Sequence, residues 1–260
     1  MSLALVTGAT AGLGAAFARH LAARGDDLLL VARDADRLAT SAAQLTAAHG
    51  VKVEALPADL STDDGCEAVA ARLRPPGVDL LVNNAGTTLN RSFVRSTDEQ
   101  EERLLRVNVL AVMRLTHAAL PRMTEQGHGA VVNVSSVSGF GPVMPGSTYS
   151  ATKAWVTNFS ESVGQSVRPF GVRVMALCPG YVRTEFHQRA GIDMSKMPDW
   201  LWLRADDVVA EAMRDLGRGK SVSIPDWRYK VATFGLRHAP HGLMYRATRD
   251  TRGKIGRDPA

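Results

Sequence analysis

The chain has 260 residues, 45% of them hydrophobic and 22% charged, which is ordinary for a protein with a substantial core. It has no run of about 18 uncharged apolar residues, so a membrane-spanning helix is not expected. No basic segment precedes its first apolar run, so a signal peptide is not expected either. The formal net charge is +5, but the residues from Lys220 onward hold nine Lys/Arg and three Asp/Glu. The basic character belongs to the tail, and no nucleic-acid-binding surface is predicted.

Cysteine and histidine usage excludes two further classes of protein. Cys66 and Cys178 lie far apart and are too few for a disulfide framework or a four-ligand metal site. The seven histidines show no metal-binding spacing, so no metal is predicted. A reducing, cytoplasmic setting fits this composition best.

Short apolar runs alternate with longer helical patterns along most of the chain. The runs predicted as strands are residues 3–7, 28–32, 51–56, 78–82, 130–134, 172–177 and 222–224. The patterns predicted as crossover helices are residues 13–24, 34–49, 62–74 and 149–168. Because the strands are apolar almost throughout, they suit a parallel sheet that is buried on both faces. The alternation predicts a doubly wound α/β fold, with one domain over residues 1–225.

A glycine-rich turn joins the first predicted strand to the first helix. It reads Thr7-Gly8-Ala9-Thr10-Ala11-Gly12-Leu13-Gly14. Glycines at this place let backbone N–H groups approach a pyrophosphate at the helix N-terminus. The spacing differs from the familiar G-x-G-x-x-G, so the turn by itself predicts a nucleotide site but no reaction.

The end of the second strand distinguishes NAD from NADP. An acidic side chain there would accept hydrogen bonds from the adenosine ribose of NAD. Here the strand ends at Ala32 and Arg33 follows, and a guanidinium can bind a 2′-phosphate, so NADP(H) is the predicted cofactor. Two alternatives stay open: Arg33 could be a solvated loop residue, and Asp34 would repel a phosphate unless it caps the next helix.

Small and polar residues follow the third and fourth strands. Asp59, with Leu60 beside it, could hydrogen bond the adenine amino group or could simply open the next helix. Ala85 and Gly86 are small enough to let the backbone approach a ribose, whereas Asn84 could tie neighbouring loops together. All of them lie at the carboxyl edge of the sheet, where ligands bind in open α/β folds.

The fifth strand runs into Ser135-Ser136, and Tyr149 follows Ser136 by thirteen residues. Tyr149 and Lys153 stand at i and i+4, so they share one face of a helix. An ammonium near a phenol, whose ordinary pKa is about 10, favours the ionised form. Such a phenol can donate and accept a proton in carbonyl chemistry, and a serine hydroxyl can hold the substrate oxygen beside it.

Taken together, these motifs resemble those of the short-chain dehydrogenase/reductase superfamily, in its common single-domain branch. The resemblance covers about residues 3–224 and implies a Rossmann-like three-layer sandwich. It rests on Thr7 to Gly14, Asp59, Asn83 to Gly86, Asn108, Ser136, the Tyr149 and Lys153 pair, and Pro179-Gly180.

The resemblance implies a role for each of these residues. Tyr149 would be the general acid/base, and Ser136, with Ser135 as the alternative, would orient and polarise the carbonyl. Lys153 would lower the pKa of Tyr149 and hold the nicotinamide ribose. Asn108 would hold a water that relays protons from Lys153, unless it is a satisfied polar residue within a helix.

The same resemblance extends to the nicotinamide end of the site. After Pro179-Gly180, the Val182 backbone and the Thr184 side chain would contact the carboxamide. The predicted function is hydride transfer between NADP(H) and a carbonyl or alcohol carbon of a small molecule, in a homodimer or homotetramer. The alternatives are an epimerase or dehydratase on the same scaffold and a non-enzymatic NADP-binding regulator.

Two segments depart from the strand-helix alternation. Residues 181–204 are too long for an ordinary loop and are predicted to be a lid over a mostly hydrophobic substrate. Its apolar side chains, which could instead only fasten the lid to the core, are Phe186, Met194, Met197, Trp200, Leu201 and Trp202.

Residues 226–260 form a basic extension that mixes aromatic and arginine side chains. This mixture suits packing on the fold or on a partner subunit, where it could cover a subunit interface or the substrate cleft, and it also suits peripheral contact with an anionic membrane. Pro240 and Gly242 predict two short helices rather than one, and disorder, chiefly after Thr251, is a third alternative.

Overall fold

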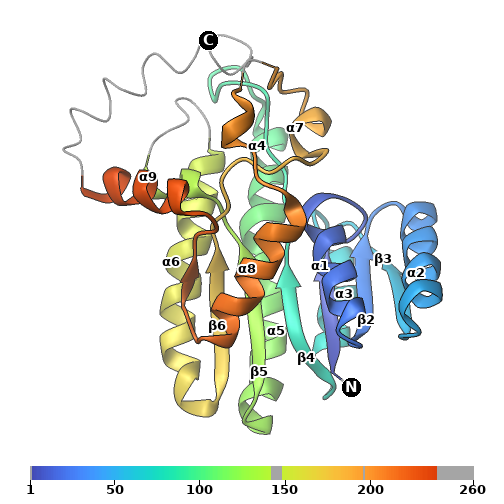
Figure 1. Cartoon of the computed structure of the whole chain (residues 1–260). Coiled ribbons are helices and arrows are strands. Elements are labelled where there is room, and N and C mark those ends of the chain that lie inside the picture. Colours follow the sequence, from blue (N-terminus) through green and yellow to red (C-terminus); the bar gives the residue numbers. More distant parts are fainter. Residues whose placement is uncertain (1, 142–147, 196, 239–260) are drawn as a thin grey trace.

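A parallel β-sheet forms the centre of the molecule (Figure 1). The computed structural model describes residues 2–141, 148–195 and 197–238. In this part of the chain the seven strands lie in the order β3-β2-β1-β4-β5-β6-β7, and every pair is parallel. The strands are β1 (Leu3–Thr7), β2 (Asp27–Ala32), β3 (Val53–Pro57), β4 (Val78–Asn83), β5 (Gly129–Val134), β6 (Val172–Leu177) and β7 (Val222–Ser223).

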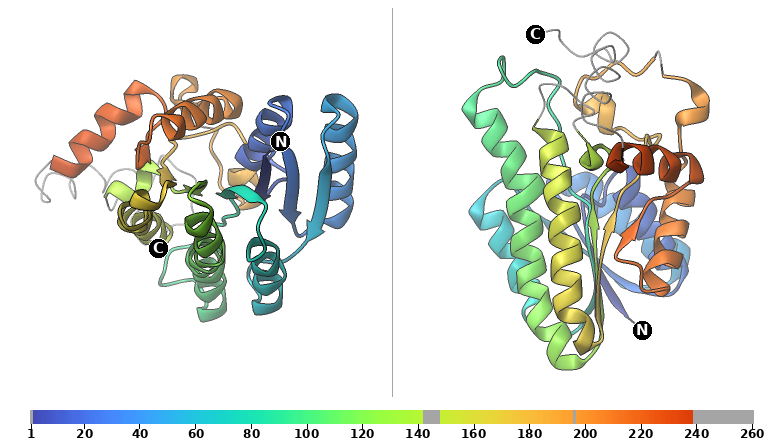
Figure 2. Two further views of the ribbon diagram at one scale, coloured as in Figure 1. Left: turned by 90° about the horizontal axis from the view of Figure 1, so that it is seen from below. Right: turned by 90° about the vertical axis from the view of Figure 1, so that its left-hand side faces the viewer.

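Helices cover both faces of the sheet and complete three layers (Figure 2). One face carries α1 (Gly12–Ala23), α2 (Ala35–His49) and α8 (Ala205–Gly217). The other carries α3 (Asp63–Leu73), α5 (Ala111–Gln126) and α6 (Tyr149–Val167). The predicted doubly wound sheet is therefore confirmed.

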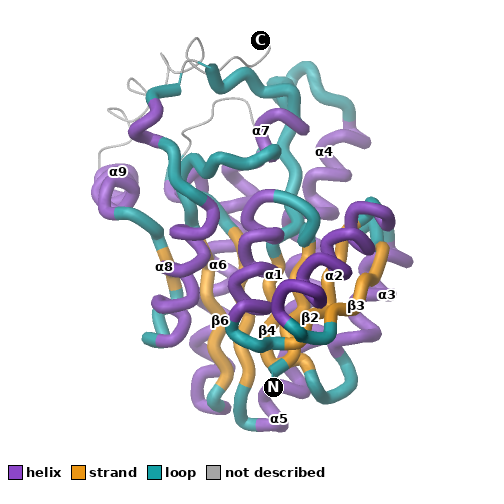
Figure 3. Tube along the Cα trace, turned by 45° about the vertical axis from the view of Figure 1, so that its right-hand side comes forward, coloured by secondary structure: helices purple, strands orange, loops and turns teal. Residues whose placement is uncertain are grey.

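The remaining elements lie mostly at the end of the molecule where the strands finish (Figure 3). They are α4 (Asp98–Leu105), the π-helical turn η1 (Arg106–Leu110), the 3₁₀ turns η2 (Val137–Phe140), η3 (Arg168–Phe170) and η4 (Asp199–Leu201), α7 (Phe186–Arg189) and α9 (Trp227–His238). Of these, η3 lies before β6, at the opposite end.

Successive strand residues enter the cores on opposite faces of the sheet. Val6 of β1 packs with the α1, α2 and α8 side, and Leu5 packs with the α3, α5 and α6 side. Leu30 and Leu29 of β2 divide in the same way. Each such side chain contributes about 1.5–3 kcal/mol on burial, so both faces of a strand must be apolar. This explains the uninterrupted apolar runs of the sequence.

The edge strand β3 differs most from its prediction. It begins at Val53 rather than Val51 and ends at Pro57. Because β3 pairs only with β2, a proline without an N–H is tolerated at its end, opposite Ala32. The other predicted strands agree with the observed ones to within one residue at each end.

The extension contributes one helix, α9, within the described residues. Its residues Tyr229 and Thr233 are buried, so this helix packs on the fold. The predicted second helix around Pro240 and Gly242, and the alternative of disorder after Thr251, fall outside the described residues. None of the described helices is long and apolar enough to cross a membrane.

Candidate active site

A cavity of about 1110 Å³ opens at the carboxyl ends of the central strands. The strand order reverses direction between β1 and β4, and ligands of open α/β sheets bind at this switch point. Most of the residues predicted for the site line this cavity: Gly8, Thr10, Gly12, Leu13, Arg33, Asp59, Leu60, Asn84, Ala85, Gly86, Ser136, Tyr149, Lys153, Pro179, Gly180, Val182 and Thr184. Thr7, Gly14 and Asn108 are not on its wall and lie behind it.

The glycine-rich turn presents bare backbone to the cavity. Gly8 and Gly12 have φ values of +65° and +54°, in the left-handed region that other residues rarely adopt. The helix that follows, α1, has no side-chain cap and no acidic residue in its first turn. By contrast, α2, α3 and α4 are capped by Asp34, Thr62 and Thr97. The first N–H groups of α1 therefore remain available to an anion.

Thr7 and Gly14 hold this turn in place. The Thr7 hydroxyl accepts hydrogen bonds from the backbone N–H of Asn84 (2.9 Å) and Ala85 (3.0 Å). The Asn84 amide donates to the carbonyl oxygens of Thr7 (2.8 Å) and Gly8 (3.2 Å), as the loop-tying alternative predicted. A Cβ on Gly14 would overlap the Gly8 carbonyl and the Asn84 amide, so only glycine fits there.

The cavity ends in basic side chains beside β2. Arg33 is exposed and lines the wall. Asp34 accepts a hydrogen bond from the backbone N–H of Arg37 (3.0 Å), which confirms that its carboxylate caps α2. Arg37, which the sequence analysis missed, also lines the cavity and donates to the Thr10 carbonyl (3.2 Å). Its place was predictable, because it stands in the first turn of the helix that leaves this edge.

Asp59 lies on the wall but is largely engaged by its own loop. One carboxylate oxygen accepts from the N–H (2.9 Å) and the hydroxyl (2.8 Å) of Ser61, and the other accepts from Arg103 (3.0 Å). Burial raises the pKa of Asp59, but these hydrogen bonds and the charges of Arg103 and Arg33 outweigh it and lower the pKa overall. The carboxylate is therefore ionised, and its contact with an adenine stays a prediction.

Lys153 and Tyr149 meet at the opposite end of the cavity. The Lys153 ammonium lies 5.6 Å from the centroid of the Tyr149 ring and donates to the Val134 carbonyl oxygen (2.8 Å). Burial lowers the pKa of Lys153 from its ordinary 10.5 to about 8. Gly86 lies above it, since a Cβ there would be 3.6 Å from the ammonium. A buried cation thus stands directly beside the phenol ring.

The two serines after β5 have different surroundings. The Ser135 hydroxyl is buried, donates to the Lys153 carbonyl (2.7 Å) and pairs with the Thr157 hydroxyl (2.8 Å). The Ser136 hydroxyl opens η2 and accepts only a 3.2 Å hydrogen bond from the Ser138 N–H. Ser135 fastens the strand end to α6, whereas the Ser136 hydroxyl has no acceptor for its proton among the described residues, and its contact with a substrate stays a prediction.

Asn108 sits in the π-helical turn η1 and is fully buried. Its amide exchanges hydrogen bonds with both the N–H (2.9 Å) and the carbonyl (2.9 Å) of Thr87, and it donates to the Thr152 hydroxyl (3.2 Å). The side chain therefore joins the loop after β4 to the helix that carries Tyr149 and Lys153. The satisfied-polar alternative describes the side chain correctly, and the predicted water relay stays a prediction.

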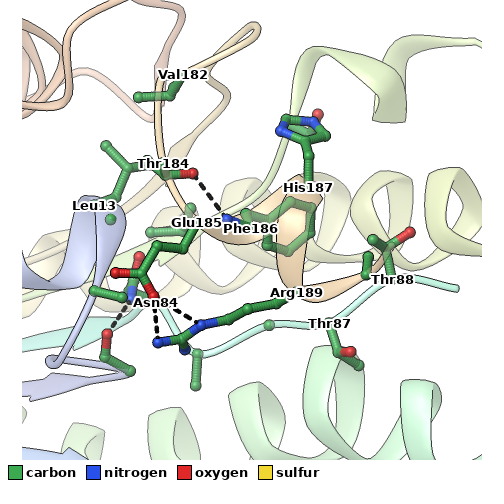
Figure 4. Close-up of a pocket in the computed structure, with 18 of the residues that line it drawn as sticks. Leu13, Asn84, Thr87, Thr88, Val182, Thr184, Glu185, Phe186, His187 and Arg189 are labelled. Atoms are coloured by element: carbon green, nitrogen blue, oxygen red, sulfur yellow. Dashed lines mark hydrogen bonds and ion pairs between the residues drawn. The ribbon is translucent and has the colours of Figure 1, made fainter. Parts of the chain in front are cut away.

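Part of the segment predicted to be a lid borders the cavity, where Figure 4 shows Val182, Thr184 and Phe186. Among its predicted apolar residues, Phe186 and Met194 line the wall, and the Phe186 ring lies 6.0 Å from that of Tyr149. Trp200 is 62% exposed and Trp202 packs on Tyr181. The apolar lid residues therefore divide between the cavity wall, the outer surface and packing within the lid.

Three wall residues come from α9, which no sequence motif indicated. They are Tyr229, Ala232 and Leu236. Their helix follows β7 at the far edge of the sheet, and only the folded chain brings it to the cavity. The extension is thus part of the site.

The cavity lies at the switch point of the sheet, and a serine, a tyrosine and a buried lysine lie at one end of it. This arrangement is typical of a dinucleotide-binding α/β enzyme. Comparison with known proteins agrees with this class. The family model described as short chain dehydrogenase matches residues 2–194. The chain belongs to the short-chain dehydrogenase family, whose members are oxidoreductases acting on alcohol and carbonyl groups.

Three similar proteins illustrate the family's range. The very-long-chain 3-oxoacyl-CoA reductase of Bos taurus is 31% identical over 250 residues, which cover 89% of this chain and 78% of that protein. A short-chain dehydrogenase from Sphingobium yanoikuyae in complex with NADPH is 41% identical, with a TM-score of 0.86 over 94% of this chain and 96% of the other. The bulky-bulky ketone specific alcohol dehydrogenase from Comamonas testosteroni is 31% identical, with a TM-score of 0.82 over 94% of each chain.

Proposed function

We propose that this protein is an NADP(H)-dependent oxidoreductase that interconverts a carbonyl and an alcohol on a hydrophobic substrate. The observation that carries the proposal is the single cavity that joins Arg33 at one end to Ser136, Tyr149 and Lys153 at the other. A cofactor with an extra phosphate at its adenosine end and a reactive ring at its other end matches this arrangement of charge and chemistry.

The cofactor would be held mainly by backbone. The uncapped N-terminus of α1 and the positive-φ glycines Gly8 and Gly12 form a cradle that suits a pyrophosphate. Arg33 would pair with a 2′-phosphate, while Asp34 is turned into the α2 cap. At the other end, Val182 and Thr184 would face the nicotinamide carboxamide. When bound there, the nicotinamide supplies or accepts the hydride.

The chain's own residues handle the substrate oxygen and its proton. Ser136 would donate a hydrogen bond to the carbonyl oxygen, and Tyr149 would donate its proton as the oxygen becomes an alkoxide. The positive charge of Lys153 beside the ring favours the phenolate that remains. Asn108 fixes the loop after β4 against α6, so that Gly86 stays above Lys153.

Apolar side chains support a hydrophobic substrate. The wall beyond Tyr149 is built by Tyr181, Phe186, Ile192, Met194, Ala232 and Leu236. Two of the similar proteins are named for acyl-CoA or bulky ketone substrates, which agrees with such a wall. Long-chain 3-oxoacyl thioesters and bulky ketones are therefore the substrates to examine first.

The proposal is tested by the loss of NADPH absorbance with a panel of ketones, aldehydes and 3-oxoacyl thioesters. We expect turnover that increases with the apolar size of the substrate and disappears in Tyr149→Phe. Tight NADPH binding without turnover of any carbonyl would instead support the non-enzymatic regulator. A product that keeps its oxidation state would support the epimerase or dehydratase.

A further inference from the structure

The hydroxyl of Tyr229 links the two ends of the lid. It accepts a hydrogen bond from the backbone N–H of Tyr181 (3.1 Å) and donates one to the carbonyl oxygen of Leu201 (2.6 Å). The first residue of the lid and a residue near its end are thus held by one side chain from a third element, α9. Tyr229 is only 5% exposed, so both hydrogen bonds are largely shielded from water.

Backbone contacts make this point the base of the lid. The Leu203 N–H donates to the Tyr181 carbonyl (2.8 Å), and the Arg183 N–H donates to the Leu203 carbonyl (3.0 Å). Val182 and Leu203 accordingly form an isolated parallel β-bridge. The two ends of the lid pair at this short base, and the Tyr229 side chain joins the base to α9.

The ring of Tyr229 also fills the space beside Gly180. A Cβ on Gly180 would overlap the Tyr229 ring atoms Cζ, Cε1 and Cε2. Gly180 does not have a left-handed φ, so the requirement for glycine here comes from the tyrosine ring and not from the backbone angle. The loop that runs from β6 into the lid therefore rests directly on α9.

The helix that carries Tyr229 is itself anchored. The backbone N–H of Asp226 donates to Glu211 of α8 (3.1 Å), and the Lys230 ammonium pairs with the same carboxylate (2.7 Å). Arg228 hydrogen bonds the Trp200 carbonyl. Tyr229 thus joins the lid to α8, which packs on the sheet.

We propose that Tyr229 is a positioning residue of the site: it holds the backbone from Gly180 to Val182 and the base of the lid against the nicotinamide end of the cavity. The inference rests on the proposed function, which places the nicotinamide there. It gives the segment beyond residue 225 a positioning role in cofactor and substrate binding. The hydroxyl fixes the lid base, and the ring fixes the Gly180 loop.

The hydroxyl is tested with Tyr229→Phe, and Thr233→Val is the matched control. The Thr233 hydroxyl is equally buried on the same helix but bonds only to α9 carbonyls, those of Tyr229 and Lys230. In Tyr229→Phe, we expect faster amide hydrogen exchange over residues 181–204 of the cofactor-free protein. We also expect the NADPH dissociation constant and the substrate KM to rise about five- to tenfold, with a smaller change in kcat. Thr233→Val should change none of these.

The ring is tested by a double-mutant cycle between Gly180→Ala and Tyr229→Ala, with NADPH affinity measured by fluorescence. Gly180→Ala alone should weaken binding by about tenfold or more, because the new methyl group meets the ring. In the double variant, the penalty of Gly180→Ala should largely disappear, because the ring is gone. Circular dichroism and thermal melting establish that each variant is folded before the comparison.

If Tyr229→Phe changed neither the rate of amide hydrogen exchange in the lid nor the NADPH dissociation constant, the role of the hydroxyl would be overturned. Strictly additive effects in the Gly180 cycle would overturn the role of the ring. If the wild-type protein bound neither NADPH nor NADH, the proposed function would fail and the role of Tyr229 toward the cofactor with it. The rate of amide hydrogen exchange in the lid of the cofactor-free protein would still decide whether Tyr229 holds the lid base.

Discussion

Arg37 and Glu185 form an ion pair across the mouth of the cofactor cavity. The Arg37 guanidinium lies 3.2 Å from a Glu185 carboxylate oxygen of the lid and also binds the Thr10 carbonyl of the glycine-rich turn. Arg189, one turn further along the lid, pairs with the same carboxylate at 2.7 Å. The hydrogen bonds from Arg37 and Arg189 lower the pKa of Glu185. This ion pair thus connects α2, on one side of the cavity, to the lid on the other.

Glu185→Gln tests whether this ion pair retains the cofactor. Both side chains are about half exposed, and such pairs contribute less than about 1 kcal/mol, so we expect only a two- to fivefold faster release. NADPH and NADH should be affected alike, because the pair does not involve the 2′-phosphate. Stopped-flow fluorescence measures both rates. An effect confined to NADPH would show that Arg37 serves phosphate recognition instead.

Arg33 is predicted to decide the preference between the two cofactors. The wild-type protein should bind NADPH at least about tenfold more tightly than NADH, a difference of about 1.4 kcal/mol. Arg33→Ala should remove most of this difference while leaving NADH affinity unchanged. Titration calorimetry with both cofactors measures it. Equal dissociation constants in the wild type would contradict the assignment of NADP(H).

Tyr149→Phe removes the proposed proton donor. We expect kcat to fall by about two to four orders of magnitude, the usual contribution of general acid catalysis. NADPH affinity should hardly change, because the phenol is not proposed to hold the cofactor. Steady-state kinetics and a binding titration on one preparation separate the two quantities. Near-normal turnover would mean that another group supplies the proton.

The buried ammonium of Lys153 should leave a signature in the pH dependence of stability. Its pKa is about 8 in the folded protein and 10.5 when exposed, so between these values the unfolded chain binds the proton and the folded protein does not. The contribution of Lys153 to the free energy of unfolding therefore rises as the pH increases from about 8 to 10.5. Below pH 8, Lys153 is charged in both states, and the full cost of burying its charge lowers the free energy of unfolding.

Denaturant unfolding of wild-type protein and Lys153→Met measures this contribution. We expect the stability of Lys153→Met relative to wild type to decrease as the pH rises from 8 to 10. Burial raises the pKa of Cys178 from 9.0 to about 11, so its contribution to stability falls as the pH rises over part of this range. It does so in both proteins, because the charge of Lys153 is the smallest of the causes that act on the Cys178 pKa. A difference that stays constant with pH would contradict a buried, titrating lysine.

The outer face of α9 offers a test of the predicted membrane contact. Trp227, Val231 and Phe234 are 71%, 64% and 67% exposed. The membrane alternative requires salt-sensitive co-sedimentation with anionic vesicles that is lost when these three become serine. The three substitutions leave the buried face of α9, which carries Tyr229, unchanged. Lost binding would therefore not result from a disrupted fold. Absence of binding by the wild type would leave packing on the fold as the role of α9.

The sequence by itself determined the fold class, because strands buried on both faces must be apolar throughout, and that pattern is visible without coordinates. Most of the residues that it indicated for the site lie on the cavity wall, since in a parallel sheet the residues that follow each strand necessarily meet at one edge. Gly8, Asn84 and Ser136 were found in this way, Lys153 was found from its helical spacing to Tyr149, and Asp34 was rightly considered as a helix cap.

Both Ser135 and Ser136 line the cavity, and only the tertiary structure decided that the Ser135 hydroxyl is the one bonded to α6. It also decided that Thr7 and Gly14 support the wall from behind. The contacts of Tyr229 with Gly180, Tyr181 and Leu201 span up to 49 positions and belong to no periodic pattern. Local spacing specifies which residues share a face, whereas the meeting of distant segments is set by how whole layers pack.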